Sequence, residues 1–307
     1  MSSGQVIQFL VAEMRQGSVK KAKFYQNEPC DVSFGNHQRP TDTVFRSLIN
    51  TSHVAAIAVM AVALHSQTAS AADICSVASG PQRVATIELY TSEGCDSCPP
   101  ADKWLRELPA KKLGTDRLIP LAFHVDYWNQ LGWTDPFAQA RFSDRQRQHS
   151  KRRGASFVFT PQLLLNGQDY RRGMLFDDIA SKVKNINSSR PLADIRLAVS
   201  KSARSLHGSV EVDARNPQQR DAQLFLALYE NGLVSEVKAG ENKGHTLKHD
   251  FVVRELAGPF NMDNIGRVRH AQTFRLAPDW KVRDLKLAAF VQAPQNGDIW
   301  QAVSGCP

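Results

Sequence analysis

Two cysteines separated by two residues, Cys95 and Cys98, are the side chains of this 307-residue chain whose type and spacing point most directly to chemistry. The apolar run Val84–Tyr90 before them predicts a strand, and Pro99–Leu108 after them predicts a helix with prolines in its first turn. A dithiol between a strand and a helix start is typical of a redox site. Free N–H groups and the helix dipole favour a thiolate at Cys95, and the spacing lets Cys98 resolve a mixed disulfide.

The same cysteine spacing also occurs in structural disulfides and in zinc sites. A structural zinc site needs two further ligands, usually from a second paired motif, and the sequence contains no such motif. Redox chemistry is therefore the favoured interpretation of Cys95 and Cys98, with a structural disulfide and metal binding as the alternatives.

Two residues further along the chain are candidates for the same site. Thr160–Pro161 opens a predicted strand, and we expect a cis peptide bond at Pro161 that positions a partner beside the dithiol; a plain strand-start proline is the alternative. His124 ends the predicted strand Leu118–Val125, where ligands meet open sheets. It could transfer a proton to the thiol, bind a metal together with Cys95 and Cys98, or be a structural histidine.

The elements that must position these residues alternate between strand and helix up to residue 190. Their order predicts an α/β thioredoxin-like domain over residues 72–190. From Leu192 the apolar period changes to two, which predicts an all-β sandwich-like domain over residues 191–307. Its expected strands are 194–200, 205–214, 223–230, 246–255, 267–276, 285–293 and 299–304.

The N-terminal part has the pattern of a secretory signal peptide. An apolar run of 11 residues, Val54–Leu64, precedes an Ala-x-Ala site that ends at Ala71. We therefore predict a signal peptide over residues 44–71 and a non-native or disordered extension over residues 1–43, with translation starting near Val44. The expected location is periplasmic or secreted.

Export has a consequence for the remaining cysteines. The mature chain would carry an even number of cysteines in an oxidising compartment. Cys75 and Cys306 lie near its two ends, and domain termini are often close together. We predict a structural disulfide between them; two free thiols in mobile tails are the alternative.

Composition sets broader limits on function. The net charge of +8 and the hydrophobic content of 42% are ordinary for a globular protein. The sequence has no nucleic-acid motif or basic patch interleaved with aromatic residues. The run Val54–Leu64 is shorter than the roughly 20 residues that span a bilayer, so we expect no stable membrane span after cleavage. We also expect no cofactor and no nucleic-acid partner.

Several of these segments together resemble the DUF1223 family, secreted bacterial proteins of unassigned function with a thioredoxin-like domain. The matching pieces are Glu88–Asp102, His124–Asn129 with Leu131–Trp133, Arg145–Gln146, Thr160–Gln162 with Asn166–Gly167, and Gly240–Gly244 with Val252–Arg254. The resemblance implies the fold and leaves the substrate open.

The sequence thus favours an exported thiol–disulfide oxidoreductase whose partners are protein thiols or disulfides in the periplasm. Cys95 would attack, Cys98 would resolve, Pro161 would position the partner and His124 would transfer a proton. The alternatives are a copper(I)-binding or copper-delivery protein that uses Cys95, Cys98 and His124, and a non-catalytic interaction module.

Overall fold

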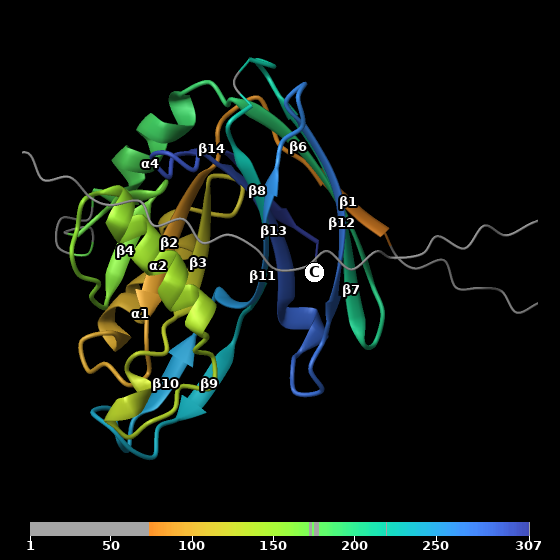
Figure 1. Ribbon diagram of the computed structural model, residues 1–307. Helices are drawn as coiled ribbons and strands as arrows, with labels where there is room; N and C mark the ends of the chain where they lie inside the picture. The colour runs from red at the N-terminus through yellow and green to blue at the C-terminus, as the bar shows by residue number, and fades with distance from the viewer. Residues whose placement is uncertain (1–73, 172–173, 175–177, 219, 307) are drawn as a thin grey trace, which may run out of the picture. The chain divides into compact units, whose positions relative to one another are not determined.

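A computed structural model describes residues 74–171, 174, 178–218 and 220–306 (Figure 1). The expected N-terminal extension and signal peptide lie outside these residues. The described residues belong to one compact unit, Gln67–Pro307. None of the described helices has the length and apolar character to cross a bilayer.

The main feature of the fold is an eight-stranded sheet with the strand order β14-β13-β8-β11-β3-β2-β4-β5. In chain order its strands are β2 (Ala85–Thr91), β3 (Leu118–His124), β4 (Gln162–Leu165), β5 (Gln168–Asp169), β8 (Gln223–Glu230), β11 (Val252–Asn261), β13 (Leu285–Gln292) and β14 (Ile299–Gly305). β2 and β3 run parallel, and every residue of both is buried.

Two smaller sheets complete the strands. A four-stranded sheet has the order β1-β6-β7-β12 and a two-stranded one pairs β10 with β9. Their strands are β1 (Ile74–Ala78), β6 (Ala193–Lys201), β7 (Ser205–Ala214), β9 (Leu233–Glu236), β10 (Thr246–His249) and β12 (Arg267–Arg275). The described helices are α1 (Pro99–Arg106), α2 (Ala140–Arg152) and α4 (Ile179–Ser188), with short 3-10 turns at Pro109–Lys111, Asn129–Leu131 and Val282–Asp284.

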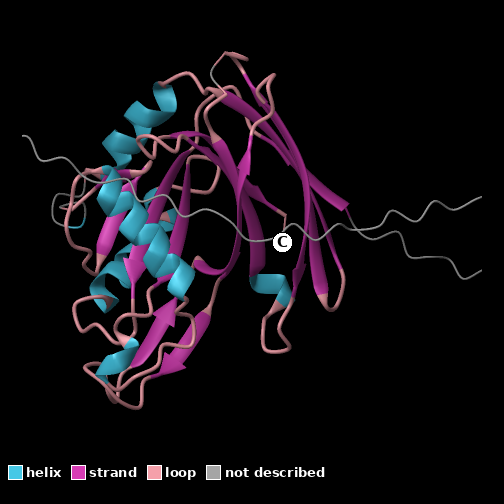
Figure 2. Ribbon diagram, viewed as in Figure 1, coloured by secondary structure: helices cyan, strands magenta, loops and turns pink. Residues whose placement is uncertain are grey.

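Strands dominate the described chain, and the helices gather on one side of the large sheet while the four-stranded sheet lies on the other (Figure 2). The side chains of β8 show why the sheet is covered on both faces. Phe225, Ala227 and Tyr229 join the core shared with the helices, and the alternate residues Leu224, Leu226 and Leu228 join the core shared with the four-stranded sheet. Alternation along a strand sends successive side chains to opposite faces, so this strand forms part of two cores.

The expected fold class, an α/β thioredoxin-like domain followed by an all-β sandwich-like domain, is wrong. The structure is mostly β, and strands from both halves of the chain share the large sheet. At the junction Val252 of β11 pairs with Ala122 of β3, whose N–H donates to the Phe251 carbonyl over 2.8 Å. Periodicity predicts that a segment is a strand but not which strand it pairs with. For this reason the sequence predicts two separate domains where the structure has one shared sheet.

Candidate functional site

Cys95 and Cys98 lie in the connection from β2 to α1. Cys98 is the N-cap of α1, and its carbonyl accepts the N–H groups of Ala101 and Asp102 at 2.9 and 3.1 Å. The prolines after it occupy the first helical positions, where a missing N–H removes no hydrogen bond. Cys95 lies one turn before this cap, and its carbonyl accepts the Cys98 N–H over 3.2 Å.

The two thiols are chemically unequal. Both cysteines are free and buried. A hydrogen bond from Cys98 lowers the pKa of Cys95 to about 6 against burial, with further help from Ser97, whose hydroxyl lies 3.3 Å from the Cys95 sulfur. Burial raises the pKa of Cys98 well above its usual range, and the bond to Cys95 and the charge of Asp102 add to this rise. Cys95 is therefore the thiolate and Cys98 keeps its proton.

Pro161 brings its neighbour Thr160 against this pair. The Thr160–Pro161 peptide bond is cis, and the Cys95 sulfur lies 3.9 Å from the Thr160 carbonyl oxygen. The Trp128 indole N–H donates to the Thr160 hydroxyl over 2.7 Å. A side chain added at Gly94 would meet Cβ of Trp128 at 3.1 Å. Trp128 therefore lies close to Gly94 and Thr160, two residues next to Cys95.

His124 ends β3 and is fully buried. Its Nδ1 lies 2.7 Å from Oδ2 of Asp135, while its Nε2 has no hydrogen-bond partner. Its ring packs edge-on against that of His249, with centroids 5.0 Å apart. Within the described part of the chain His124 makes no hydrogen bond to either thiol, so its assignment as the proton-transfer group stays a prediction.

His249 stands at the end of β10, with its Nε2 3.0 Å from Oε1 of Glu93 and its Nδ1 3.8 Å from Oδ1 of Asp102. The longer contact is an ion pair, because a hydrogen bond needs a shorter separation. Burial alone would lower the pKa of His249, but Asp102 and Glu93 raise it to about 10. His249 is therefore an imidazolium between two carboxylates at neutral pH.

One group of possible metal ligands forms among the described residues: Asp102, His124 and His249 each offer an atom within 4.8 Å of the others, and all three are buried. The group does not include the cysteines. The copper alternative depends on Cys95, Cys98 and His124, and these three residues do not form such a ligand group among the described residues. Copper binding stays a prediction.

Most of the residues around His124 are not among the predicted site residues. Asp135 accepts the Phe137 N–H over 2.8 Å, and helix α2 begins further on, at Ala140. Its second oxygen also accepts the Glu93 N–H over 2.8 Å, so it joins two loops. Glu93 lies inside the matching segment Glu88–Asp102 but was not predicted as a site residue, and its contact with His249 could not be foreseen because 156 residues separate the two.

The segment from Gly240 to Leu247, expected to be a turn or a contact loop, holds the cysteine connection in place. The Asn242 side-chain amide donates to the carbonyls of Glu93 and Cys95, both at 2.9 Å. The Glu241 carboxylate accepts the Asp96 N–H over 3.0 Å. The glycine-flanked polar composition of the segment was the available signal for this contact.

Glu88 of β2 lies in a separate buried network of charged and polar side chains. Arg145 lies 2.7 Å from Oε1, and the Tyr90 hydroxyl donates to Oε2 over 2.7 Å. Burial would raise the pKa of Glu88, but Arg145 and His149 lower it to about 2. Its carboxylate is thus fixed in the ionised state inside a structural ion pair.

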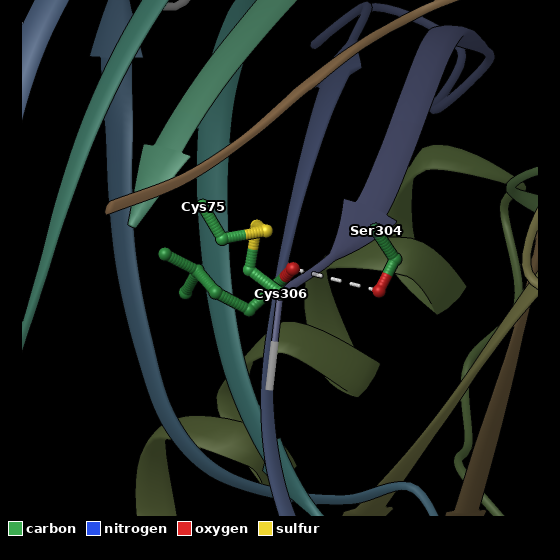
Figure 3. The surroundings of a disulfide bond; sticks show 4 residues. Cys75, Ser304 and Cys306 are labelled. Carbon is green, nitrogen blue, oxygen red and sulfur yellow. Dashed lines mark hydrogen bonds between the residues drawn. A yellow bond between two sulfur atoms is a disulfide. The ribbon is translucent and has the colours of Figure 1, made fainter. Parts of the chain in front are cut away.

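Cys75 and Cys306 form a disulfide with a Cα–Cα distance of 5.5 Å (Figure 3). Cys75 belongs to β1, an edge strand of the four-stranded sheet, and Cys306 follows β14, an edge strand of the large sheet. The bond therefore joins the two sheets.

The fold and site define a β-rich protein with a buried, asymmetric dithiol at the start of α1 and a histidine–carboxylate cluster to which the same helix contributes Asp102. The chain belongs to DUF1223, a family described as proteins of unknown function, which it matches over residues 86–292. A crystal structure of a protein from Agrobacterium tumefaciens is similar, with 25% identity, a TM-score of 0.53 and coverage of 73% of this chain and 95% of that one. HBP35 of Porphyromonas gingivalis is 14% identical, with a TM-score of 0.56 and coverage of 74% and 76%. A comparison with curated proteins finds no significant match.

Proposed function

We propose that this chain is an exported thiol–disulfide oxidoreductase that acts on protein thiols or disulfides through Cys95 and Cys98. The observation that carries the proposal is the opposite shift of two neighbouring thiols, with the pKa of Cys95 lowered to about 6 and that of Cys98 raised. A low-pKa thiolate is a nucleophile at neutral pH, and a protonated neighbour is held in reserve to resolve its product. Export rests on the signal-peptide pattern before residue 72.

The proposed reaction passes two electrons between the dithiol and a partner. The Cys95 thiolate attacks one sulfur of the partner disulfide, forms a mixed disulfide and releases the other sulfur as a thiolate that takes a proton. Cys98 then loses its proton and attacks the Cys95 sulfur, which releases the second partner sulfur as a thiol. The chain ends with a Cys95–Cys98 disulfide, the partner is reduced, and the reverse sequence oxidises a dithiol partner.

Access to Cys95 is the structural requirement of this reaction. The sulfur is covered, but Asp96 and Ser97 beside it are exposed. Thr160 adjoins the cis Pro161, accepts the Trp128 indole N–H and places its carbonyl oxygen 3.9 Å from the Cys95 sulfur. Because Cys95 is fully buried, a partner chain reaches it only when such neighbours shift. Trp128→Ala, which removes the hydrogen bond to Thr160, is therefore expected to speed the reaction with a disulfide substrate.

The test is a redox titration of the full chain in defined glutathione buffers, followed by an insulin-reduction assay. Turnover should be lost in Cys95→Ser, while Cys98→Ser should accumulate a mixed disulfide. The Cys75→Ala/Cys306→Ala double variant is the matched control, because it removes two cysteines outside the proposed site and should keep turnover. Absence of turnover in the unaltered chain, with a potential far below the compartment poise, would identify the pair as a structural disulfide instead.

A further inference from the structure

The cluster of Asp102, His124 and His249 contains two buried histidine nitrogens without a hydrogen-bond partner, which is unusual for a buried polar network. Nε2 of His124 and Nδ1 of His249 are both buried without a hydrogen-bond partner. Buried polar atoms are nearly always satisfied, and two orphan imidazole nitrogens in one cluster require an explanation.

The other atoms of the three residues are fixed by neighbours. Asp135 holds Nδ1 of His124 at 2.7 Å and Glu93 holds Nε2 of His249 at 3.0 Å. The Thr91 hydroxyl donates to Oδ2 of Asp102 over 2.9 Å, which leaves Oδ1 on the side of His249. A carboxylate behind each histidine is the arrangement that orients imidazole ligands toward a metal.

The negative charge buried around the cluster also favours a bound cation. Glu93, Asp102 and Asp135 place three carboxylates in a buried region, and over the described residues their ion pairs are with His124 and His249 alone. Buried charge is unfavourable unless it is paired. A divalent cation bound among these residues would offset this excess of negative charge.

We propose that Asp102, His124 and His249 form a binding site for a divalent first-row transition metal of the zinc type. Two imidazoles and one carboxylate suit such cations, whereas magnesium and calcium take oxygen ligands. The incoming ion would displace the Nδ1 proton of the His249 imidazolium into solvent, because a ligating imidazole must be neutral. In a tetrahedral zinc site neighbouring ligand atoms lie about 3.4 Å apart. Nδ1 of His249 lies 3.8 Å from Oδ1 of Asp102, and the ligand atoms of all three residues lie within 4.8 Å of one another. To bind zinc, these atoms would only have to move slightly closer together.

The cluster is also reachable. A pocket of about 180 Å³ is lined by Asp102 and His249 together with residues from α1 and β10. The pocket reaches two of the three proposed ligands, and His124 lies beyond its lining residues. Neither cysteine belongs to the proposed ligand set, so metal binding does not depend on whether Cys95 and Cys98 turn over.

The test measures metal binding by the chelator-stripped full chain. One Zn²⁺ should bind per chain in a competition titration with a chromophoric chelator, Co²⁺ should give the visible absorption of a nitrogen–oxygen site, and Mg²⁺ should not compete. Asp102→Asn and His249→Gln should each lower zinc affinity by at least about 100-fold. Circular dichroism of each variant verifies folding, and Asp102→Asn keeps the shape of the side chain.

Two controls separate this site from other sources of binding. His149→Gln is the matched control, because His149 is equally buried and also has an orphan Nε2 but lies beside Glu88 outside the cluster; its zinc affinity should not change. Cys95→Ser/Cys98→Ser should also keep the affinity. Failure of Zn²⁺ and Co²⁺ to bind, or binding that is lost with the cysteines and retained in Asp102→Asn and His249→Gln, would overturn the proposal.

Discussion

At the scale of single residues, the environment makes two identical side chains different. Cys95 and Cys98 are both buried cysteines of one short segment, yet the pKa of one falls and that of the other rises. The hydrogen bond between them lowers the pKa of Cys95, whereas burial is the main cause of the rise for Cys98 and the same hydrogen bond adds to it. The sequence motif predicted that Cys95 and Cys98 lie close together, whereas the contacts of Cys95 with Ser97 and Thr160 are seen only in the folded structure.

This asymmetry predicts how Cys95 reacts with pH. Because the thiolate is the reactive form above the pKa, alkylation of Cys95 by iodoacetamide should rise with a midpoint near the pKa of about 6 rather than 9. Cys98→Ala removes the largest cause of the shift and should move the midpoint upward, while Ser97→Ala should move it less. Rates measured by mass spectrometry of the Cys95 peptide check this, and a midpoint unaffected by Cys98→Ala would contradict it.

At the scale of elements, a turn can be recognised in the sequence without its tertiary neighbour. Asn166–Gly167, a residue pair typical of tight hairpin turns, connects β4 to β5 with both residues at positive φ. The structure adds that this turn packs on a second one far along the chain. A Cβ at Gly167 would lie 1.8 Å from the Gly297 carbonyl oxygen.

Two glycine variants separate backbone strain from this contact. Gly167 and Gly154 have φ values of 74° and 67°, but a Cβ at Gly154 would meet nothing within 4 Å. Gly154→Ala should cost about 1 kcal/mol of unfolding free energy from the left-handed backbone. Gly167→Ala should cost about 2 kcal/mol or more beyond that, because the two turns must separate. Urea unfolding measures both, and equal losses would show that the contact between turns is unimportant.

Strand boundaries illustrate what local patterns can and cannot fix. β7 and β8 have the expected bounds, because alternating or continuous apolar residues are bounded by turn residues. The strand expected over residues 246–255 is divided into β10 and β11, with Phe251 at a φ of 60° between them. This break between the two strands places His249 beside His124, and no local sequence pattern predicts the break.

At the scale of the whole molecule, the disulfide between Cys75 and Cys306 links residues 231 positions apart. The sequence expected this pair from the even cysteine number and the position of the two residues near the chain ends. It did not show what the bond joins, because the sheets are assembled only by long-range strand pairing.

Removal of this bond should destabilise the chain. A crosslink over such a long loop restricts the unfolded ensemble, so Cys75→Ala/Cys306→Ala should lower the unfolding free energy by about 2–5 kcal/mol. Cys95→Ala/Cys98→Ala is the control, since those cysteines are free and their loss removes no crosslink. Urea denaturation compares the two, and an unchanged midpoint in the Cys75/Cys306 variant would count against a stabilising role.

The sequence by itself determined the local features: the dithiol at a helix start, many of the strands and a family resemblance. These are encoded over a few residues, by spacing, period and turn chemistry. Only the tertiary structure decided that strands from both halves share one sheet, and that Glu93, Asp102, His124, Asp135 and His249 meet beside α1. The physical reason is that strand pairing and buried charge networks join residues far apart in the chain, and such partners leave no periodic trace in the sequence.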